Sequence, residues 1–428
     1  MVKENKIMKK LTAKILIVCI LALQIFMLVA CDGTATEPAV TTPAATTPAA
    51  TTPVVITPSG DDNTPTAPNE IKNIILIIGD GMGLDHIAAG QMMYQKSYDF
   101  TNWQFTTSNT DSVNSSGKVS GTTDSAAGGT ALATGTLTQN YYLGKDYKGK
   151  DVRTILDLAK NKGKMTGIVT TDVLHGATPS AFSAHSTSRY DTEGIVASQI
   201  NSGVNLLCGH IDANCTSQKS AIEAKGYAYS DTFVGVDATL DDEMAYWQLD
   251  LGGDIAVAMN AEVALKDATL KALTFLDRDE DGFALMIEQA HVDKFSHDKN
   301  IVGTTWAVNS LNDTVEAILA WLGDRTDTAI VITADHETGG LSVSAESYYS
   351  SKAQARVENA AGEKPYIYYK YSSNDHTSAK VGVFVYGIRA DFSQFSYYGT
   401  AATIKNINVY DLLSDVLNKP AVYGERAA

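Results

Sequence analysis

The feature of this chain that most constrains its fold is a series of short apolar runs rich in β-branched residues. Five of them are continuous, at Ile71–Ile78, Met165–Thr170, Phe283–Ile287, Thr328–Thr333 and Val381–Tyr386. A continuous apolar run of this length is typical of a strand that is buried on both faces of a sheet. Helix-like stretches lie between the runs, among them 261–276 and 311–322.

Strands that alternate with helices predict the fold class. We expect an α/β protein with a mostly parallel central sheet and helices on both faces, which is a three-layer α/β/α sandwich. In such sheets ligands bind beyond the carboxyl ends of the strands. The segment from about 208 to 253 is less regular, and we interpret it as an excursion from the sheet rather than a second domain.

The first 69 residues do not follow this pattern. Five lysines precede Ile15–Ala30, an apolar run that has the length of a signal peptide and is short for a membrane span. Its end resembles the lipobox of bacterial lipoproteins, in which the next residue, here Cys31, becomes lipidated; the alternative is an ordinary membrane anchor. Residues 31–69 are rich in threonine and proline and cannot form a core.

We therefore predict a signal peptide over 1–30, a tether over 31–69 and one globular domain over 70–428. The protein would be exported and lipid-anchored through Cys31 to the outer face of a bacterial cell membrane, or periplasmic. The formal net charge of −16 argues against nucleic-acid binding. Cys208 and Cys215 would remain after export, and in an oxidising compartment we expect them to form a disulfide, with two free thiols as the alternative.

The stretch 121–135, GTTDSAAGGTALATG, contains the candidate nucleophile. Its small residues allow a closely packed helix to begin at Ser125, where helix amides favour an anion. A serine hydroxyl needs a base or a metal ion to react. The Gly-x-Ser-x-Gly elbow of serine hydrolases is absent, whereas Asp, His and Glu residues stand at the ends of the apolar runs. This combination predicts a serine that is activated by metal ions.

Acidic and imidazole groups follow several predicted strands. Asp80 lies in GDGMG after the first strand; a nucleotide fingerprint would need a third glycine, which leaves a metal ligand or a solvated residue in a tight glycine turn. Asp293 and His297, at i and i+4, would face one way on a helix and form an ordinary zinc ligand set. Asp335 and His336 follow another strand and can converge on one ion. His376 precedes the last strong strand and, considered alone, would be a surface residue.

A calcium-loop pattern is also present. It consists of Asp277, Asp279, Asp281, Gly282 and Glu288. An EF-hand needs a helix on each side, but an apolar strand follows the glycine here. We therefore interpret the aspartates as a polar turn.

Several motifs, taken in order, resemble those of the alkaline phosphatase family. They are GDGMG, TDSAAGGTALATG, GATPSAFSAHSTSR, GFALMIEQAHVDKFSH and TADHETGG, and the resemblance extends from Ile71 to about Gly387. It implies an alkaline phosphatase-like catalytic domain that hydrolyses phosphate monoesters through a phosphoserine and releases inorganic phosphate. It also implies two Zn²⁺ and one Mg²⁺ ion as cofactors, and a family that is often dimeric.

The resemblance also implies roles for individual residues. Ser125 would be the nucleophile, Arg189 would bind the phosphoryl oxygens, Asp124 would orient that arginine, and Lys294 would make a further phosphate-side contact. The metal ligands would fall into three sets: Asp293, His297 and His376 for one zinc, Asp80, Asp335 and His336 for the second, and Asp80, Thr178 and Glu288 for magnesium.

The sequence departs from the family at one position. Two residues before Thr178 the family commonly has an acidic or imidazole side chain, but this chain has Gly176. We therefore expect a weaker third metal site, with His175 as a substitute if the chain bulges there. The remaining histidines are expected to be structural or exposed: His86, His185, His210 and His291.

Two other functions stay open at this point. A phosphodiesterase or another hydrolase of the same superfamily would keep the fold and change the substrate. A calcium-binding surface lipoprotein would use the acidic loop and the tether, but it would leave the ordered motifs unexplained.

Overall fold

The computed structural model describes residues 70–232, 243–249, 261, 263–344, 353–356, 366–395 and 403–419. The chain divides into two units, Met1–Thr64 and Pro65–Ala428, and all described residues belong to the second. The predicted signal peptide, the tether and Cys31 lie outside the described residues. Within the described part, no helix has both the length and the apolar character needed to cross a membrane.

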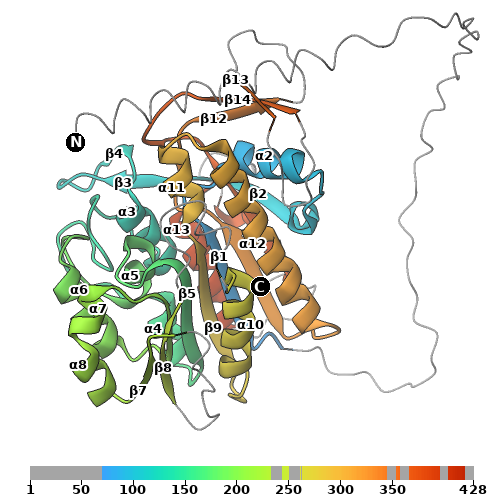
Figure 1. Cartoon of the computed structure of the whole chain (residues 1–428). Coiled ribbons are helices and arrows are strands. Elements are labelled where there is room, and N and C mark those ends of the chain that lie inside the picture. Colours follow the sequence, from blue (N-terminus) through green and yellow to red (C-terminus); the bar gives the residue numbers. More distant parts are fainter. Residues whose placement is uncertain are drawn as a thin grey trace, which may run out of the picture. The chain divides into compact units, whose positions relative to one another are not determined.

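The described residues form a central sheet of ten strands (Figure 1). Its order is β17-β2-β16-β10-β1-β9-β5-β6-β8-β7. The strands are β1 (Asn73–Gly79), β2 (Gln104–Asn109), β5 (Met165–Val173), β6 (Leu206–His210), β7 (Tyr227–Ser230), β8 (Met244–Gln248), β9 (Phe283–Gln289), β10 (Thr328–Thr333), β16 (Val381–Tyr386) and β17 (Thr403–Lys405). The seven strands from β10 to β7 are parallel, whereas β16 is antiparallel to both of its neighbours. All five apolar runs are strands, which confirms the predicted mostly parallel sheet.

Helices cover both faces of this sheet. Alternate side chains of β1 show why: Ile74, Leu76 and Ile78 enter one hydrophobic cluster, while Ile75 and Ile77 enter another on the opposite face. The first cluster includes residues of α3 (Ser125–Thr134), α4 (Ile155–Lys160), α5 (Ala177–Ser183), α6 (Thr192–Ser202), α7 (Ala213–Ser217), α8 (Lys219–Ala224) and α13 (Ile407–Asn418). The second includes residues of α2 (Leu84–Tyr94), α10 (Leu265–Leu276), α11 (His291–His297) and α12 (Ile301–Leu322). The three-layer α/β/α prediction is therefore confirmed.

Short elements complete the described part. Three small sheets consist of β3 (Asp111–Val113) with β4 (Val119–Thr122), β11 (Glu337–Thr338) with β15 (His376–Thr377), and β12 (Leu341–Ser344) with β14 (Tyr366–Tyr371) and β13 (Ala353–Arg356). Two 3₁₀ helices are η1 (Asp99–Asn102) and η2 (Phe392–Phe395).

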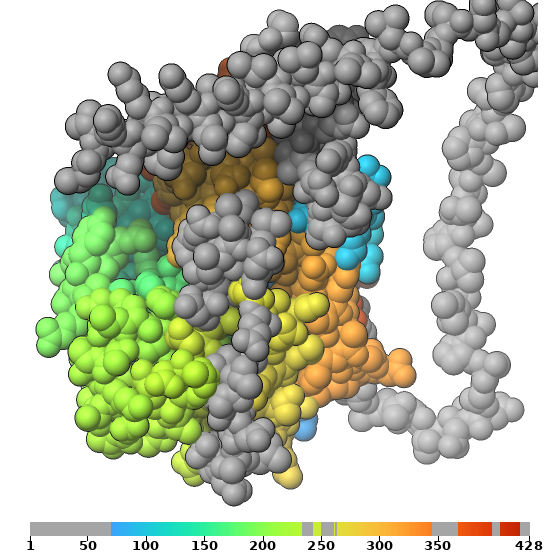
Figure 2. Space-filling view, viewed as in Figure 1, coloured from blue at the N-terminus to red at the C-terminus, as the bar shows by residue number. Residues whose placement is uncertain are grey.

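In Figure 2, the yellow-green, yellow and orange surfaces of α8, α10 and α12 face the viewer.

We predicted that residues 208–253 leave the sheet, and this prediction is wrong for the part that the structure describes. Residues 206–230 and 244–248 contain β6, β7 and β8, which extend the sheet at one edge. These strands were not recognised because β7 (YAYS) and β8 (MAYWQ) are short and contain aromatic residues and alanine in place of β-branched residues. Tyr246 and Trp247 of β8 are nevertheless buried, on opposite faces of the sheet.

The predicted disulfide is also wrong, because Cys208 and Cys215 are both free and buried. Cys208 lies on β6 and packs in the same cluster as Trp247, whereas Cys215 lies on α7 in the cluster of the opposite face. The sheet therefore separates the two thiols. Burial raises the pKa of Cys208 to about 12 and that of Cys215 to about 11, so neither thiol is activated.

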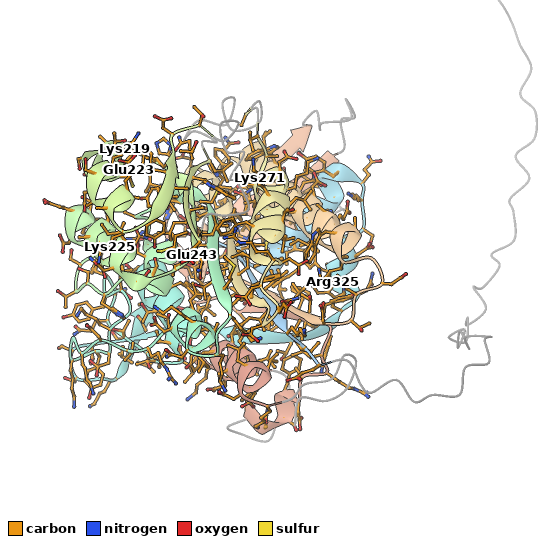
Figure 3. All side chains as sticks on the ribbon, turned by 90° about the horizontal axis from the view of Figure 1, so that it is seen from below. Lys219, Glu223, Lys225, Glu243, Lys271 and Arg325 are labelled. Atoms are coloured by element: carbon orange, nitrogen blue, oxygen red, sulfur yellow. The ribbon has the colours of Figure 1, made fainter. Side chains whose placement is uncertain are left out.

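The acidic loop at 277–282 is a turn between α10 and β9, as we interpreted it. The Asp277 carboxylate accepts two hydrogen bonds of 2.6 Å from the Arg325 guanidinium, and Figure 3 labels this arginine near the edge of the molecule. Asp279 accepts a hydrogen bond from the Asp281 amide, and Gly282 has a φ of 84° that leads the chain directly into β9. This is not an EF-hand, since a strand follows the loop.

Candidate active site

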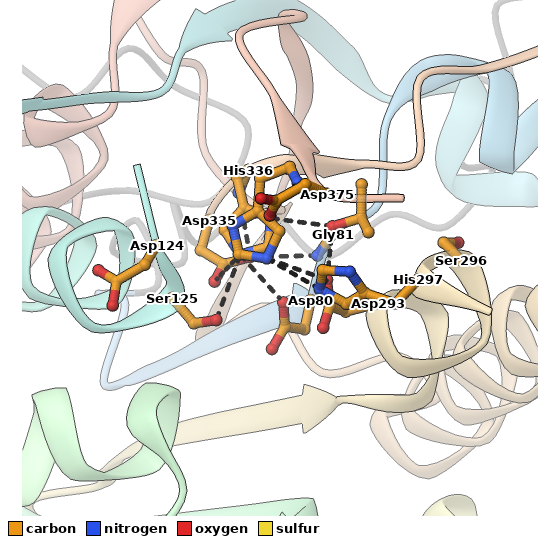
Figure 4. Close-up of polar contacts among 12 residues, drawn as sticks. Asp80, Gly81, Asp124, Ser125, Asp293, Ser296, His297, Asp335, His336 and Asp375 are labelled. Atoms are coloured by element: carbon orange, nitrogen blue, oxygen red, sulfur yellow. Dashed lines mark hydrogen bonds and ion pairs between the residues drawn. The ribbon is translucent and has the colours of Figure 1, made fainter. Parts of the chain in front are cut away.

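Neighbouring strand ends create the first group of polar side chains. Because β1 and β10 are paired in register, Asp80 and Asp335, which follow them, lie at the same edge of the sheet. His336 Nε2 lies 3.4 Å from Asp80 Oδ1 and 3.3 Å from Asp335 Oδ2 (Figure 4). All three side chains are buried, and their candidate ligand atoms lie within 4.8 Å of one another.

A second group adjoins the first and shares His336 with it. Asp293, His336 and His376 also bring ligand atoms within 4.8 Å of one another. Asp293 and His297 are one turn apart on α11, with Asp293 Oδ1 at 3.3 Å from His297 Nε2 and at 3.5 Å from His376 Nε2. His376 lies on β15, which pairs with β11 just after His336, and the two imidazoles stack with ring centroids 3.5 Å apart. We call these two groups the paired clusters.

The charges of the paired clusters are strongly perturbed. Burial raises the pKa of Asp80 well above its ordinary value, and the nearby Asp335 and Asp293 add to the effect. Burial and the same neighbour, Asp293, raise the pKa of Asp335 to about 6. A hydrogen bond to Asp293 raises the pKa of His297 to about 9. The carboxylates thus repel one another, and protonated imidazole partly offsets that repulsion.

The donor set of the paired clusters fits divalent cations. Asp80 Oδ1 and Asp335 Oδ2 are buried and have no hydrogen-bond partner among the described residues, which is costly for a carboxylate. His297 Nε2 and His376 Nε2 point at each other across 3.1 Å. Imidazole nitrogens and carboxylate oxygens that converge in this way are the usual ligands of zinc. The residues present therefore fit two such ions.

Ser125 lies beside the paired clusters. It begins α3, and its Oγ is 3.2 Å from His336 Nε2 (Figure 4). Asp124 is the N-cap of the helix and accepts a 2.9 Å hydrogen bond from the Ala127 amide. Gly128 explains part of the small-residue pattern, because a Cβ there would lie 2.8 Å from the Asp335 carbonyl oxygen. The small residues thus bring the serine close to Asp335 and His336.

Arg189 is held beside the serine through Asp124. Its Nη1 donates a 3.2 Å hydrogen bond to Asp124 Oδ2. The arginine side chain is 26% exposed, so the guanidinium can still bind a ligand. A guanidinium fork suits two oxygens of one phosphoryl or carboxylate group.

A third group lies on the other side of Asp80, at the ends of β9 and β5. Glu288 is the second-last residue of β9, and it interacts with the buried Thr178 of α5. Glu288 Oε2 accepts a hydrogen bond from Thr170, but Oε1 is buried without a hydrogen-bond partner among the described residues. Burial and the nearby Asp172 raise the pKa of Glu288 to about 8. The unpaired oxygen and the high pKa indicate that a cation would be favourable here.

Asp172 is a residue of this site that the sequence analysis missed. The pairing of β5 with β6 shifts register between Val169 and Val173, and Asp172 lies in this irregular stretch. A Cβ on Gly176 would overlap Asp172 Oδ2 and lie 2.9 Å from its Cγ. The Asp172 carboxylate therefore fills the space that a side chain at 176 would need. Glu288, Thr178, Asp172 and Gly176 are called the third-cation corner below.

Lys294 contacts the third-cation corner. Its Nζ forms an ion pair with Asp172 Oδ1. Burial alone would raise the pKa of Asp172, but the charge and the hydrogen bond of Lys294 outweigh it and lower that pKa. The sequence contains one hint of Asp172, which is the lack of a side chain at Gly176. Another side chain has to occupy the space that this glycine leaves.

His175 does not reach the third-cation corner. Its Nε2 lies 3.0 Å from Asp212 Oδ2, and Asp212 is the N-cap of α7. The register shift lies within β5, between Val169 and Val173, and not at His175, and the side chain beside Gly176 is Asp172. The four other histidines have hydrogen-bond partners outside the paired clusters: His86 with Ser296, His185 with the Gly144 carbonyl, His210 with Gln248 and His291 with Thr171.

Comparison with known proteins places the chain in a family. The family model described as alkaline phosphatase matches residues 71–218 and 247–399. Alkaline phosphatase 4 of Bacillus subtilis is 32% identical over 300 residues, which are 64% of this chain and 63% of that relative. Alkaline phosphatase 3 of the same organism is 30% identical over 316 residues, 69% of this chain and 68% of the relative. The chain thus spans about two thirds of the length of these relatives.

A solved structure supports the fold. The alkaline phosphatase from the Antarctic bacterium TAB5 matches with a TM-score of 0.68 and 24% identity, over 82% of this chain and 100% of the other. The fold and the buried carboxylate and imidazole clusters define an α/β protein built to hold metal ions beside a serine. The chain belongs to the alkaline phosphatase family.

Proposed function

We propose that the protein is a metal-dependent phosphatase that hydrolyses phosphate monoesters and releases inorganic phosphate. The observation that carries the proposal is the position of His336. This residue belongs to both paired clusters and lies 3.2 Å from Ser125 Oγ. The serine is therefore within reach of both proposed cation sites, as an in-line displacement at phosphorus requires.

The chain's own residues support each step of such a reaction. Arg189 would bind two phosphoryl oxygens, and Asp124 would hold the guanidinium in place. Ser125 Oγ would lose its proton to solvent and attack phosphorus, the bond to the ester oxygen would break, and the leaving oxygen would take up a proton from solvent to give the alcohol. Water would then cleave the phosphoserine. Two zinc ions, held by the residues of the paired clusters, would supply charge stabilisation for the attacking and leaving oxygens.

We also propose a third cation, magnesium, at the third-cation corner. Asp80, Thr178 and Glu288 would supply oxygen ligands, which magnesium prefers. Asp172 would supply the acidic group that the sequence lacks at 176, directly or through a water molecule. A solved structure that is 22% identical to this chain, a variant of the TAB5 enzyme, has magnesium bound in a site called M3. This similarity supports the proposal that the fold can hold magnesium.

Export and lipid attachment at Cys31 remain a separate proposal. They are supported by the lysine-rich start, the apolar run and the cysteine that follows it. Incorporation of labelled palmitate in a bacterial host is the test, and loss of the label in Cys31→Ser is the expected result. Labelling that persists in this variant would contradict the proposal.

The test of the catalytic proposal compares p-nitrophenyl phosphate with bis(p-nitrophenyl) phosphate. We expect faster turnover of the monoester, complete inhibition by a chelator, and a loss of about 10³-fold or more in kcat/KM for Ser125→Ala. Ser116→Ala, an exposed serine of the β3–β4 hairpin, is the matched control. A phosphorylated Ser125 peptide, trapped by acid quenching, would support the intermediate. Diester preference, or full activity of Ser125→Ala, would refute the proposal.

A further inference from the structure

Two exposed tyrosines lie beside the residues proposed to bind the phosphoryl group. Tyr141 is 50% exposed and Tyr190 is 73% exposed. Their ring centroids are 5.8 Å apart, and the rings are tilted by 38°. Large aromatic side chains usually bury most of their surface, so an exposed pair in contact suggests a binding surface. We call Tyr141 and Tyr190 the tyrosine pair.

The backbone of Tyr141 is in a conformation that tyrosine rarely adopts. Its φ is 74°, in the left-handed region that favours glycine. Hydrogen bonds impose this conformation: the Tyr141 amide donates to Asp124 Oδ2 at 3.1 Å, and Asn140 Oδ1 accepts from the Asp124 amide at 3.2 Å. Backbone strain of this kind persists only where surrounding contacts hold it, and it often occurs at active sites and ligand-binding sites.

Asp124 links the tyrosine pair to the phosphoryl site. The same oxygen, Oδ2, accepts hydrogen bonds from the Tyr141 amide and from Arg189 Nη1. Tyr190 directly follows Arg189 in the chain. One ring is thus fixed on each of the two segments that position Arg189 beside Ser125.

The burial of the site gives these rings a role. Ser125 and His336 are at most 4% exposed, so the organic part of a bound monoester must project towards solvent. Arg189 is partly exposed and therefore lies on the side of the site that opens to solvent. The tyrosine pair lies next to this arginine. A flat aromatic ring in the alcohol part of the ester would meet the tyrosine rings there, whereas a small aliphatic alcohol would gain little from them.

We infer that Tyr141 and Tyr190 form a leaving-group subsite for phosphate monoesters whose alcohol part carries a planar aromatic ring. The inference rests on the proposed phosphatase function. Stacking on a tyrosine does not depend on the identity of the ring, so the subsite accepts either a phenolic ring or a nucleobase. The reaction is unchanged, since the bond between phosphorus and the ester oxygen breaks as before; the tyrosine pair affects how tightly the substrate binds.

The experiment measures kcat and KM for 1-naphthyl phosphate, adenosine 5′-monophosphate and glycerol 2-phosphate. With Tyr190→Ala and Tyr141→Gly, we expect KM for the aromatic substrates to rise about 5-fold, and KM for glycerol 2-phosphate to stay within about 2-fold. A rise for the naphthyl ester alone assigns the subsite to phenolic esters. A rise for the nucleotide alone assigns it to nucleobases.

Tyr141→Gly also separates a functional role from a structural one. Glycine tolerates the left-handed backbone, so we expect the Tm to stay the same or rise by about 2 °C while the aromatic preference falls. Gln95→Gly is the matched control, because Gln95 is exposed, has a φ of 48° and caps α2. It should change the Tm in the same direction and leave all three KM values unchanged.

Three results would overturn the inference. They are an equal change in kcat/KM for all three substrates, no change for any of them, and a change in oligomeric state when Tyr190 is replaced, which would make the pair an interface between two copies. None of these results would contradict the proposed function. That proposal fails separately if the wild-type protein does not hydrolyse monoesters or if Ser125→Ala retains activity.

Discussion

The paired clusters and the third-cation corner occupy the same edge of the sheet, yet they are assembled differently. In the paired clusters, every ligand follows a strand or lies on α11 or β15 at the position that the motif order indicates. In the third-cation corner, the acidic group comes from Asp172, four residues before the expected position, and Gly176 leaves the space for it. A chemical group can therefore keep its place in space while its place in the sequence changes.

The two regions also differ in how their negative charge is offset. In the paired clusters, burial alone would raise the pKa of Asp293, but hydrogen bonds to His297 and His376 hold it well below its ordinary value. In the third-cation corner, the permanent charge of Lys294 lowers the pKa of Asp172, while Glu288 keeps a pKa raised to about 8. We therefore expect removal of a ligand to have a larger effect in the paired clusters, where cations must replace protons.

The largest effect is expected for Asp293→Asn, which removes the charge that both histidines share. We predict that kcat/KM falls about 10³-fold or more and that the zinc content falls by at least one ion per chain. Elemental analysis of the purified protein measures the second quantity. Asp298→Asn, an exposed carboxylate directly after the same helix, is the control. Unchanged zinc content in Asp293→Asn would mean that the paired clusters do not hold the ions.

The next largest effect is expected at the third-cation corner. Asp172→Asn should weaken magnesium binding about 10- to 100-fold, as is typical for groups that support a metal ligand, and should leave the zinc content unchanged. Isothermal titration of magnesium into zinc-loaded protein measures this. Tight magnesium binding that is unaffected by the substitution would show that Asp172 has no part in the site.

A double substitution tests whether the carboxylate can be moved. Gly176→Asp alone should destabilise the protein by about 1–3 kcal/mol because the new side chain overlaps Asp172. Combined with Asp172→Ala, it should recover the lost stability and part of the magnesium affinity, since the carboxylate then occupies the same space from position 176. If the double variant is no better than the sum of the single ones, the two positions are not interchangeable.

These two regions also show what the sequence can and cannot predict. Asp80, Asp335 and His336 were predictable because apolar runs locate the strand ends, and parallel strands bring their carboxyl ends together. The i,i+4 spacing indicated Asp293 and His297, whereas His376 was expected only from the family resemblance. Asp172 was not predictable, since a register shift of one strand decides which side chain reaches the corner. A sequence pattern does not contain that shift, although the missing side chain at Gly176 hinted that another residue must fill the space.

The wrong predictions have the same kind of cause. The strands β7 and β8 were missed because they are short and contain aromatic residues and alanine in place of β-branched residues. The disulfide between Cys208 and Cys215 seemed reasonable from their short separation, but the sheet lies between the two thiols. In each case the sequence shows which residues are present, while the face of the sheet on which they lie depends on tertiary packing.

Two adjacent glycines of α3 allow a direct comparison of the two regions. A Cβ on Gly128 would lie 2.8 Å from the Asp335 carbonyl oxygen, whereas one on Gly129 would lie 3.1 Å from the Ala181 Cβ and 3.4 Å from the Thr178 Cα. Gly128→Ala should thus displace the serine from the paired clusters and lower kcat/KM about 10-fold, by analogy with other small displacements. Gly129→Ala should have a smaller effect, limited to magnesium affinity. The reverse order of effects would contradict this assignment of the two glycines.

The smallest effect is expected for Asp212→Asn, which tests why His175 stays away from the third-cation corner. Burial alone would raise the pKa of Asp212, but hydrogen bonds from His175 and from the first turn of α7 outweigh it and lower that pKa to about 2. A lowered pKa stabilises the folded state above the unfolded value of about 3.9, and this contribution is lost as the pH falls through about 2.

Asparagine can still cap the helix, so only the charge contribution is removed. We predict that metal-free Asp212→Asn is less stable than the wild type by about 1 kcal/mol at pH 7 and that the difference shrinks between pH 4 and pH 2. Urea unfolding at several pH values measures it, with Asp191→Asn at the N-cap of α6 as the control. If magnesium affinity rises in Asp212→Asn, the freed His175 reaches the corner, and the ion pair with Asp212 is what keeps it from competing with Asp172.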